Sequence, residues 1–383
     1  MGDINIEFDD PLGVFYAGRF VTGTVTLNAK KPISARLLKI CATGLAHVHW
    51  RERYGDREII YSANLTYLEG ESLAWTSPDG TNTIPAGNHA FPFSVAIPPS
   101  CPPSFEGVVG FIRYQVHVEL DRPWKFNKRS RKCFSVIPLY DLNAIPTAIN
   151  PMVNSTSKNT GLLFKNGTVK MTVNLPKRGY VPGEILPITV DIDNGSSKPV
   201  SRVAAKIKQF SHFYVTMEQP EAVATGNPSF SSSRRQPPQR KNRTLTRIVA
   251  EGQRKLSIAP GTRDQVVLSI RIPSTVPSFE CPIITAEYYV SVRIDTDASF
   301  GASLKCQFPL IIGTIPLYQM VVVDGVEPSE PPEYSLADPP SYEEAVGGSV
   351  KIPGDNEAFS PRYPVYNNLE ASQQPSQSNV VKL

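Results

Sequence analysis

A long hydrophobic run is the first thing this sequence lacks. Its most apolar stretch, residues 309–323, is short and is interrupted by Pro316, whereas a membrane-spanning helix needs about 20 mostly apolar residues. Residues 1–7 contain acidic side chains and no apolar core, so we predict no secretory signal peptide. These absences favour a protein that resides in the cytoplasm.

Cysteine is scarce and scattered. An odd number of cysteines without a Cys-x-x-Cys spacing argues against a disulfide framework and against a zinc site. We therefore expect reduced thiols, no metal and no cofactor. The five cysteines are Cys41, Cys101, Cys133, Cys281 and Cys306.

Motifs of catalysis are missing as well. The sequence has no Gly-x-Gly-x-x-Gly, no phosphate-binding loop and no defensible Ser-His-Asp order. His47 and His49 are spaced to share one strand face, but no third metal ligand accompanies them. We predict that the protein is not an enzyme.

Proline, by contrast, is abundant, with 36 among 383 residues. Because proline breaks helix interiors, this content argues against a helical protein and favours short strands joined by turns. The length suits two domains and a tail.

The body of the chain contains one unit twice. Two Pro-Ser-Phe-Glu sequences end at Glu106 and Glu280, and each precedes a strand-like alternation of apolar and polar residues. The second copy is nine residues longer before this point, and we expect the extra residues within 226–243. The other matches are 18–27 with 183–192, 112–120 with 287–294, and the Ile-Pro-Leu sequences at 137–139 and 315–317.

The repeat predicts an all-β protein with two tandem antiparallel β-sandwiches and a disordered C-terminal tail. We place the N-terminal domain at 1–147, a polar linker at 148–165, the C-terminal domain at 166–318 and the tail at 319–383. The tail carries ten acidic and three basic residues, so the rest of the chain is basic. A basic body suggests contact with an anionic surface: membrane lipid, a phosphorylated peptide or the tail itself.

The tail holds two Pro-Pro-x-Tyr (PPxY) motifs eight residues apart. Paired prolines favour an extended polyproline-II helix, which WW domains bind in aromatic-lined grooves. The alternative is a solvated linker with incidental tyrosines. The candidate WW-binding residues are Pro331, Pro332, Tyr334, Pro339, Pro340 and Tyr342.

A cluster of cations precedes Cys133. One interpretation is a solvated turn, and the other is a contact for anionic lipid or a phosphorylated peptide. Trp124 and Phe126 lie among these cations and either insert at an interface or pack. The cluster consists of Arg122, Lys125, Lys128, Arg129, Arg131 and Lys132.

Together these features resemble the α-arrestins, or arrestin domain-containing proteins. The resemblance extends from residue 4 to about 345. It is carried by the Pro-Ser-Phe-Glu turns, the PPxY motifs, Leu-Asp-Arg-Pro-Trp at 120–124, Arg-Gly-Tyr-Val-Pro-Gly-Glu at 178–184 and Leu-Ile-Ile-Gly-Thr-Ile-Pro-Leu at 310–317.

The resemblance implies two arrestin-type, immunoglobulin-like sandwiches without catalytic activity. It also implies an adaptor that links transmembrane receptor or transporter cargo to WW domains of Nedd-family HECT-type ubiquitin ligases, promoting cargo ubiquitination, endocytosis and endosomal sorting or degradation. Such an adaptor is cytoplasmic and peripheral at the plasma membrane and endosomes. The alternatives are a ligase-independent cargo-sorting scaffold and a signalling scaffold for other WW-domain proteins.

Two further signals are weaker. Tyr366 and Leu369 have the Tyr-x-x-apolar form of an endocytic sorting signal, which would bring in clathrin adaptors. Visual and β-arrestins contain a buried charged cluster that senses phosphate. Asp295 and Asp297 follow a strand in a suggestive place for it, although an exposed hairpin turn is the alternative.

Overall fold

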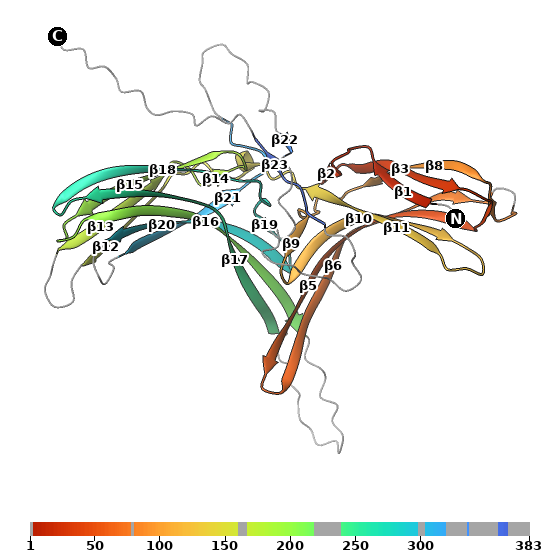
Figure 1. The fold of residues 1–383 in the computed structure, drawn as a ribbon, viewed down its shortest axis with the longest axis horizontal. Helices are drawn as coiled ribbons and strands as arrows, with labels where there is room; N and C mark the ends of the chain where they lie inside the picture. The colour runs from red at the N-terminus through yellow and green to blue at the C-terminus, as the bar shows by residue number, and fades with distance from the viewer. Residues whose placement is uncertain are drawn as a thin grey trace, which may run out of the picture.

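The two sandwiches lie end to end along the long axis of the molecule (Figure 1). The computed structural model describes residues 3–77, 80–159, 167–217, 239–297, 303–318, 335–336 and 359–366. Within these ranges the regular structure is β-strand apart from one 3₁₀ helix, η1 (Leu142–Ala144). The prediction of an all-β protein with two tandem sandwiches is confirmed.

The first sandwich packs a three-stranded sheet against a six-stranded one, with a small β4–β7 pair beside them. The three-stranded sheet has the order β1 (Asp3–Phe8), β3 (Phe20–Ala29), β8 (Gly87–Ala96). The larger sheet runs β2 (Val14–Tyr16), β11 (Lys128–Ile137), β10 (Gly110–Asp121), β5 (Leu37–Tyr54), β6 (Arg57–Thr76), with β9 (Phe105–Gly107) on β10. The small pair is β4 (Ile33–Ser34) and β7 (Thr83–Ile84).

The second sandwich has the same plan. Its larger sheet runs β14 (Gly179–Tyr180), β21 (Leu304–Ile312), β20 (Ile284–Thr296), β16 (Val200–Met217), β17 (Gln239–Ile258), with β19 (Phe279–Glu280) on β20. The facing sheet runs β12 (Met152–Asn159), β13 (Thr168–Leu175), β15 (Ile185–Asn194), β18 (Thr262–Arg271).

The strand orders of the two larger sheets correspond one to one, so the repeat seen in the sequence is a repeat of structure. In both sheets one strand pair is parallel, β2 with β11 and β14 with β21. The alternation in the sequence matches burial. Along β5, every second residue from Leu38 to Trp50 is buried, and the residues between them are only partly buried. The Ile-Pro-Leu match is shifted, because Ile137 ends β11 whereas Ile315 lies beyond the end of β21.

The extra residues of the second copy lie between β16 and β17. The equivalent strands β5 and β6 are joined by Gly55 and Asp56 alone, while β16 and β17 are separated by 218–238, which lie outside the described residues. We expected the insertion at 226–243, but residues 239–243 belong to β17. The nine-residue difference holds as a net value, because the shorter β17–β18 connection offsets part of the insertion between β16 and β17.

The predicted linker at 148–165 is wrong over most of its described length. Residues 152–159 form β12, which pairs along its whole length with β13 and adds an edge strand to the second sandwich. Its continuous run of Asn, Ser, Thr and Lys side chains has the composition of a polar linker because the strand is exposed on both faces. The stretch before it also belongs with the second sandwich, since the Leu142 N–H donates to the Ile315 carbonyl at 3.2 Å.

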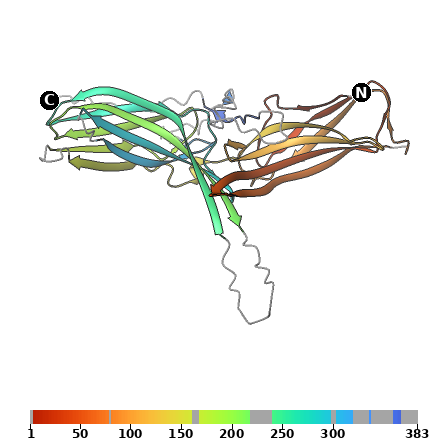
Figure 2. The same ribbon diagram turned by 60° about the horizontal axis from the view of Figure 1, so that its bottom comes forward.

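Buried side chains of both sandwiches form one continuous apolar cluster. On one side of the contact between the sandwiches, the β5–β6 and β16–β17 hairpins project together; strands β22 (Ser335–Leu336) and β23 (Pro364–Val365) lie on the opposite side (Figures 1 and 2). No helix in the described part of the chain has the length and apolar character needed to span a membrane.

Candidate functional site at the junction of the two sandwiches

The two Pro-Ser-Phe-Glu turns face each other where the sandwiches meet, a region that we call the junction. The Phe105 ring centroid lies 5.6 Å from that of Phe279, its counterpart in the repeat, and 6.2 Å from that of Phe213 on β16. The same motif therefore supplies both halves of an aromatic contact.

The serine of each motif fixes its turn to the last strand of its sandwich. Ser104 Oγ accepts the Val136 N–H at 2.9 Å, and Ser278 Oγ accepts the Ile312 N–H at 3.0 Å. The tyrosine of the following strand fixes the preceding residues, because Tyr114 OH donates to the Pro102 carbonyl at 2.7 Å. Each motif thus encodes one rigid turn, which explains why the sequence repeats it.

A buried ion pair lies under the first turn. Arg113 donates from Nε to Glu106 Oε1 at 2.5 Å and from Nη2 to Oε2 at 2.9 Å, and both residues are less than one-tenth exposed. The guanidinium carbon also lies 4.5 Å from the centre of the Phe111 ring. Two-point hydrogen bonding satisfies charges that would otherwise be costly to bury.

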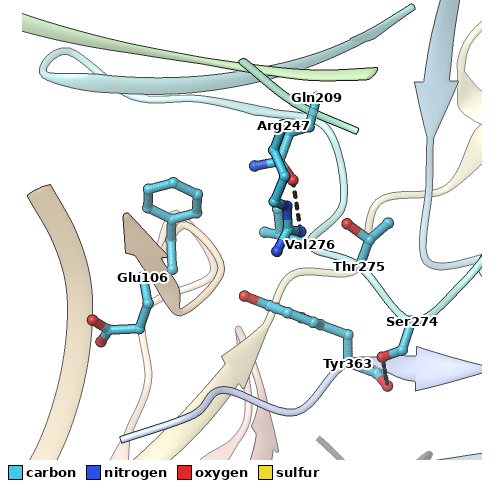
Figure 3. Close-up of a pocket in the computed structure, with 8 residues that line it drawn as sticks. Glu106, Gln209, Arg247, Ser274, Thr275, Val276 and Tyr363 are labelled. Carbon is cyan, nitrogen blue, oxygen red and sulfur yellow. Dashed lines mark hydrogen bonds between the residues drawn. The ribbon is translucent and has the colours of Figure 1, made fainter. Parts of the chain in front are cut away.

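A cavity of about 20 Å³ lies between the turns (Figure 3). Arg247 Nη2 donates to Gln209 Oε1 at 3.1 Å along one wall. A cavity of this size holds about one water molecule and has no room for an organic substrate. Its lining residues are Phe105, Glu106, Gln209, Arg247, Ser274, Thr275, Val276 and Tyr363.

Tyr363 shows that part of the C-terminal tail occupies the junction. The ring is 6% exposed, and its hydroxyl donates to the Ser104 carbonyl at 2.9 Å. Burial raises the pKa of Tyr363 well above its ordinary value. Residues 359–366, which we call the tail segment, therefore depart from the disordered tail that the sequence predicts.

The tail segment bonds to both sandwiches. The Arg362 N–H donates to Ser135 Oγ at 3.0 Å in the first sandwich. In the second, Ser274 Oγ donates to the Tyr363 carbonyl at 3.4 Å, and the Tyr366 N–H donates to the Pro182 carbonyl at 3.0 Å. The segment thus clips the two sandwiches together.

Tyr366 and Gly183 fix the far end of the tail segment. The Tyr366 hydroxyl donates to the Thr314 carbonyl at 2.7 Å, and the ring is 4% exposed. A β-carbon at Gly183 would lie 2.0 Å from the Tyr366 carbonyl oxygen, and φ of Gly183 is +95°. Both the backbone conformation and the close approach require glycine.

The tail segment also pairs with the residues that follow the first PPxY motif. Ser335 pairs with Val365, and Leu336 with Pro364, as strands β22 and β23. Ser335 is covalently attached to Tyr334. The residues predicted to bind WW domains, Pro331, Pro332, Tyr334, Pro339, Pro340 and Tyr342, lie outside the described residues.

The sorting signal predicted at Tyr366 and Leu369 is subject to this packing. Leu369 lies outside the described residues, while the Tyr366 ring is buried against Leu142, Ala148 and Val181. A tyrosine-based signal must present its ring to a receptor pocket, so in this conformation Tyr366 is inaccessible. The signal stays a prediction that requires release of the tail segment.

The predicted basic cluster divides between two faces of the β10–β11 hairpin. Arg129 pairs with Glu119 at 3.0 Å, whereas Lys132 faces the other sheet, donating to the Ile6 carbonyl at 3.1 Å with its ammonium above the Phe8 ring. Arg131 shares the outward face with Arg129. The six cations therefore do not all share one face, because neighbouring strand residues point to opposite faces, and their contact with anionic lipid or phosphate stays a prediction. Arg122, Lys125 and Lys128 do converge, on a hollow that Lys31 completes.

Asp295 lies neither in a buried charged cluster of the phosphate-sensing kind nor in an exposed turn. It lies within β20 and accepts hydrogen bonds from Arg202 Nε at 2.9 Å and Arg293 Nε at 2.6 Å. Burial acts to raise the pKa of Asp295, but these hydrogen bonds outweigh it and lower the pKa from its ordinary value. Within the described ranges, no three or more His, Cys, Asp or Glu side chains form a group that could hold a metal ion.

Comparison with known proteins decides the family. Residues 4–143 match the model of the arrestin (or S-antigen) N-terminal domain, and residues 165–317 match that of the C-terminal domain. The chain belongs to the arrestin domain-containing family, the α-arrestins. The two matched regions correspond to the two sandwiches.

Several curated relatives of this α-arrestin carry the family name. "Arrestin domain-containing protein 17" of Caenorhabditis elegans is 26% identical over 330 residues, which cover 83% of this chain and 72% of the relative. "Arrestin domain-containing protein 4" of Mus musculus is 29% identical over 320 residues, covering 80% and 70%. "Arrestin domain-containing protein 1" of Mus musculus is 34% identical over 203 residues, covering 51% and 44%.

Sequence reasoning about this α-arrestin missed the tail segment and the residues that receive it. The available signal was compositional: Tyr363, Val365 and Tyr366 follow one another closely within an otherwise polar, acidic tail. Aromatic side chains concentrated in such a tail indicate a segment that packs against something. The receiving residues were hidden because Ser104, Pro182 and Thr314 use mainly backbone carbonyls.

Proposed function

We propose that this α-arrestin is a non-enzymatic adaptor that links membrane-protein cargo to WW-domain HECT-type ubiquitin ligases. The observation that carries the proposal is the pair of PPxY motifs in the tail of a chain whose family is one of adaptors and scaffolds.

The placement of the tail supports this role. Strand β22 follows Tyr334 directly and pairs with the tail segment, which is clipped to both sandwiches. A ligase that binds the PPxY motifs is thereby tethered beside the body that engages cargo. Tethering raises the effective concentration of the ligase at cargo and favours ubiquitin transfer.

The spacing of the motifs permits shared binding. Equivalent points eight residues apart in a polyproline-II chain lie about 25 Å from each other. Two WW domains fit side by side at that separation only in a tight arrangement. Where both engage, the gain in affinity from bivalency reaches on the order of 10²-fold.

In this proposal the protein works in the cytoplasm, at the surfaces of the plasma membrane and endosomes. Cargo ubiquitination there leads to endocytosis and endosomal sorting or degradation. The partners are transmembrane receptors or transporters, Nedd-family ligases and, through Tyr366 and Leu369 after release, clathrin adaptors.

A reconstituted ubiquitination reaction tests the proposal. Full-length protein is incubated with a Nedd-family HECT ligase, its activating enzymes and ubiquitin, and ubiquitin attached to the adaptor is measured. We expect efficient modification of the wild type and a loss of at least tenfold in Tyr334→Ala/Tyr342→Ala. Equal modification of the double variant would remove tail-dependent recruitment from the account.

A ligase-independent sorting scaffold is the second candidate. The continuous apolar core of the two sandwiches favours it, because a body with such a core can bind cargo whether or not a ligase is attached. Cargo turnover in cells that express Tyr334→Ala/Tyr342→Ala separates the two, because only the adaptor loses function. Affinity purification then shows whether ligases or other WW-domain signalling proteins are the main partners.

A further inference from the structure

The turn between β10 and β11 lies at the end of the first sandwich away from the junction (Figure 1). In the turn between β10 and β11, Trp124 is 102% exposed and Phe126 is 97% exposed. Other large apolar side chains on the described surface reach at most 64%. Two large rings held fully in water are unfavourable in the free protein, so this turn has the character of an insertion site.

The turn holds this conformation against a backbone preference. Trp124 has φ of +58°, a left-handed value that is rare for a bulky residue and that glycine or asparagine would adopt more easily. Asn127 fixes the turn, since its Oδ1 accepts the Arg122 N–H at 3.2 Å and its Nδ2 donates to Glu119 Oε1 at 2.6 Å. The ring is therefore presented outward by an ordered turn.

Cations surround a hollow at the base of the same turn. The hollow has a volume of about 190 Å³ and includes no acidic side chain in its lining. Arg122 Nε is buried there without a hydrogen-bond partner among the described residues. Asp121 next to it is engaged by Arg36 at 2.9 Å, and Lys128 lies 3.7 Å from Asp3. The lining residues are Lys31, Pro32, Ile33, Ser34, Leu120, Arg122, Lys125 and Lys128.

We propose that this hairpin is a membrane-binding site, in which the hollow takes the phosphate headgroup of an anionic phospholipid while Trp124 and Phe126 insert into the bilayer interface. Aromatic rings favour the interfacial region of bilayers, and lysine and arginine beside them gain from the negative surface potential of the cytoplasmic leaflet. A phosphorylated peptide would satisfy the cations, but it gives the two exposed rings no apolar environment.

The inference deepens the proposed function, because an adaptor for membrane cargo gains from holding the membrane directly. The site lies at the end of the first sandwich that is far from strands β22 and β23 (Figure 1). Lipid binding and WW binding are measured in separate assays on the same variants, so the failure of one is distinguishable from the failure of the other.

The test uses full-length protein and phosphatidylcholine vesicles, with or without phosphatidylserine and phosphatidylinositol bisphosphate. The protein has three tryptophans, of which Trp50 is 3% exposed and Trp75 is half-buried. Emission changes on insertion therefore report mainly Trp124. We expect co-sedimentation and a blue shift of emission with anionic vesicles, and neither with phosphatidylcholine alone.

Variants separate the two parts of the site. Trp124→Ala/Phe126→Ala should weaken vesicle binding at least tenfold. Lys31→Glu/Lys125→Glu should weaken it by as much, and the remaining affinity for anionic vesicles should no longer depend on salt concentration. Because these side chains are exposed, all four changes should leave the thermal unfolding temperature unchanged. The controls are Phe20→Ala, an exposed aromatic residue of the first sandwich, and Lys170→Glu, an exposed lysine of the second; both should bind vesicles as the wild type does.

Two results would overturn the inference. One is a Trp124→Ala/Phe126→Ala variant that binds anionic vesicles with the same affinity as the wild type. The other is a wild-type protein that binds a phosphorylated peptide but not vesicles. If that peptide binding leaves tryptophan emission unshifted and is lost in Lys31→Glu/Lys125→Glu, the hollow is a phosphopeptide site. Calorimetric titration with a pair of linked WW domains should give wild-type affinity for every variant, and that result tests the proposed function by itself.

Discussion

The two sandwiches contain the same Pro-Ser-Phe-Glu turn, yet its glutamate has opposite environments in them. Glu106 is 4% exposed and receives two hydrogen bonds from Arg113. Glu280, its counterpart, is exposed. The position equivalent to Arg113, one before the buried tyrosine of the next strand, is Glu287 in the second sandwich.

The difference teaches that the repeat fixes the backbone of the turn and the neighbouring strand fixes its charge. A glutamate opposite an arginine can be buried in an ion pair, whereas a glutamate near a second glutamate remains in water, because like charges repel and burial is costly. The first sandwich therefore presents a buried, paired carboxylate to the junction, whereas the second leaves its glutamate in water; both sandwiches offer main-chain and hydroxyl groups to the tail segment.

Removing the arginine should produce the largest contrast between the sandwiches. Arg113→Ala leaves Glu106 buried without its partner and should cost about 3–5 kcal/mol in the free energy of unfolding. Glu287→Ala, at the equivalent exposed position, should change it by about 0.5 kcal/mol or less. Urea unfolding of the full-length variants measures both.

A double variant separates the charge from the shape of the side chain. Glu106→Gln/Arg113→Met removes both charges while keeping similar volumes, and it should recover at least half of the loss in Arg113→Ala. Equal losses in Arg113→Ala and Glu287→Ala would contradict the contrast between the two turns.

A second contrast concerns the glycines that begin the repeat. Gly18 and Gly183 both have positive φ, and each donates its N–H to the isoleucine before the proline turn, Ile97 or Ile272. Only a β-carbon at Gly183 would collide with the tail segment, since the nearest atom to one at Gly18 is Pro99 Cβ at 3.5 Å. Gly183→Ala should therefore expel the tail segment, while Gly18→Ala should add only backbone strain.

Hydrogen exchange at the Tyr366 amide reports this release, because that N–H bonds to the Pro182 carbonyl. Protection should fall at least tenfold in Gly183→Ala and stay at the wild-type level in Gly18→Ala. Full protection in Gly183→Ala would show that the contact between Gly183 and Tyr366 does not hold the segment.

The smallest expected effect depends on pH and belongs to the second sandwich. Because the pKa of Asp295 is lowered in the folded state, its contribution is present above the unfolded pKa of about 3.9 and is lost as the pH falls through the folded pKa. Asp295→Asn should be less stable than the wild type by about 1 kcal/mol or less at pH 7. Urea unfolding at a series of pH values should show the difference closing in acid; a difference that is constant with pH would argue against this ion pair as its source.

The sequence alone predicts the duplicated sandwiches because their signals are local. Alternation along each strand and the ordered recurrence of the same short sequences, such as Pro-Ser-Phe-Glu, require no knowledge of long-range contacts. The strand β12 was hidden because a polar edge strand has the composition of a linker.

The candidate site was harder to predict for a different reason. The tail segment docks more than 40 residues beyond the end of the second sandwich, and it uses carbonyl groups of Ser104, Pro182 and Thr314 that any residue type would supply. Which cations share a face likewise depends on the register of β10 with β11, in which Leu120 pairs with Lys128. One-residue differences in register reverse the face of every side chain.

The central claim is that the body of this α-arrestin holds the tail while the tail tyrosines recruit the ligase. Its most direct test is calorimetric titration of full-length protein with two linked WW domains from a HECT ligase. We expect weakened binding in Tyr334→Ala and in Tyr342→Ala, and binding abolished only in the double variant. Undiminished binding by the double variant, or no binding by the wild type, would contradict the claim.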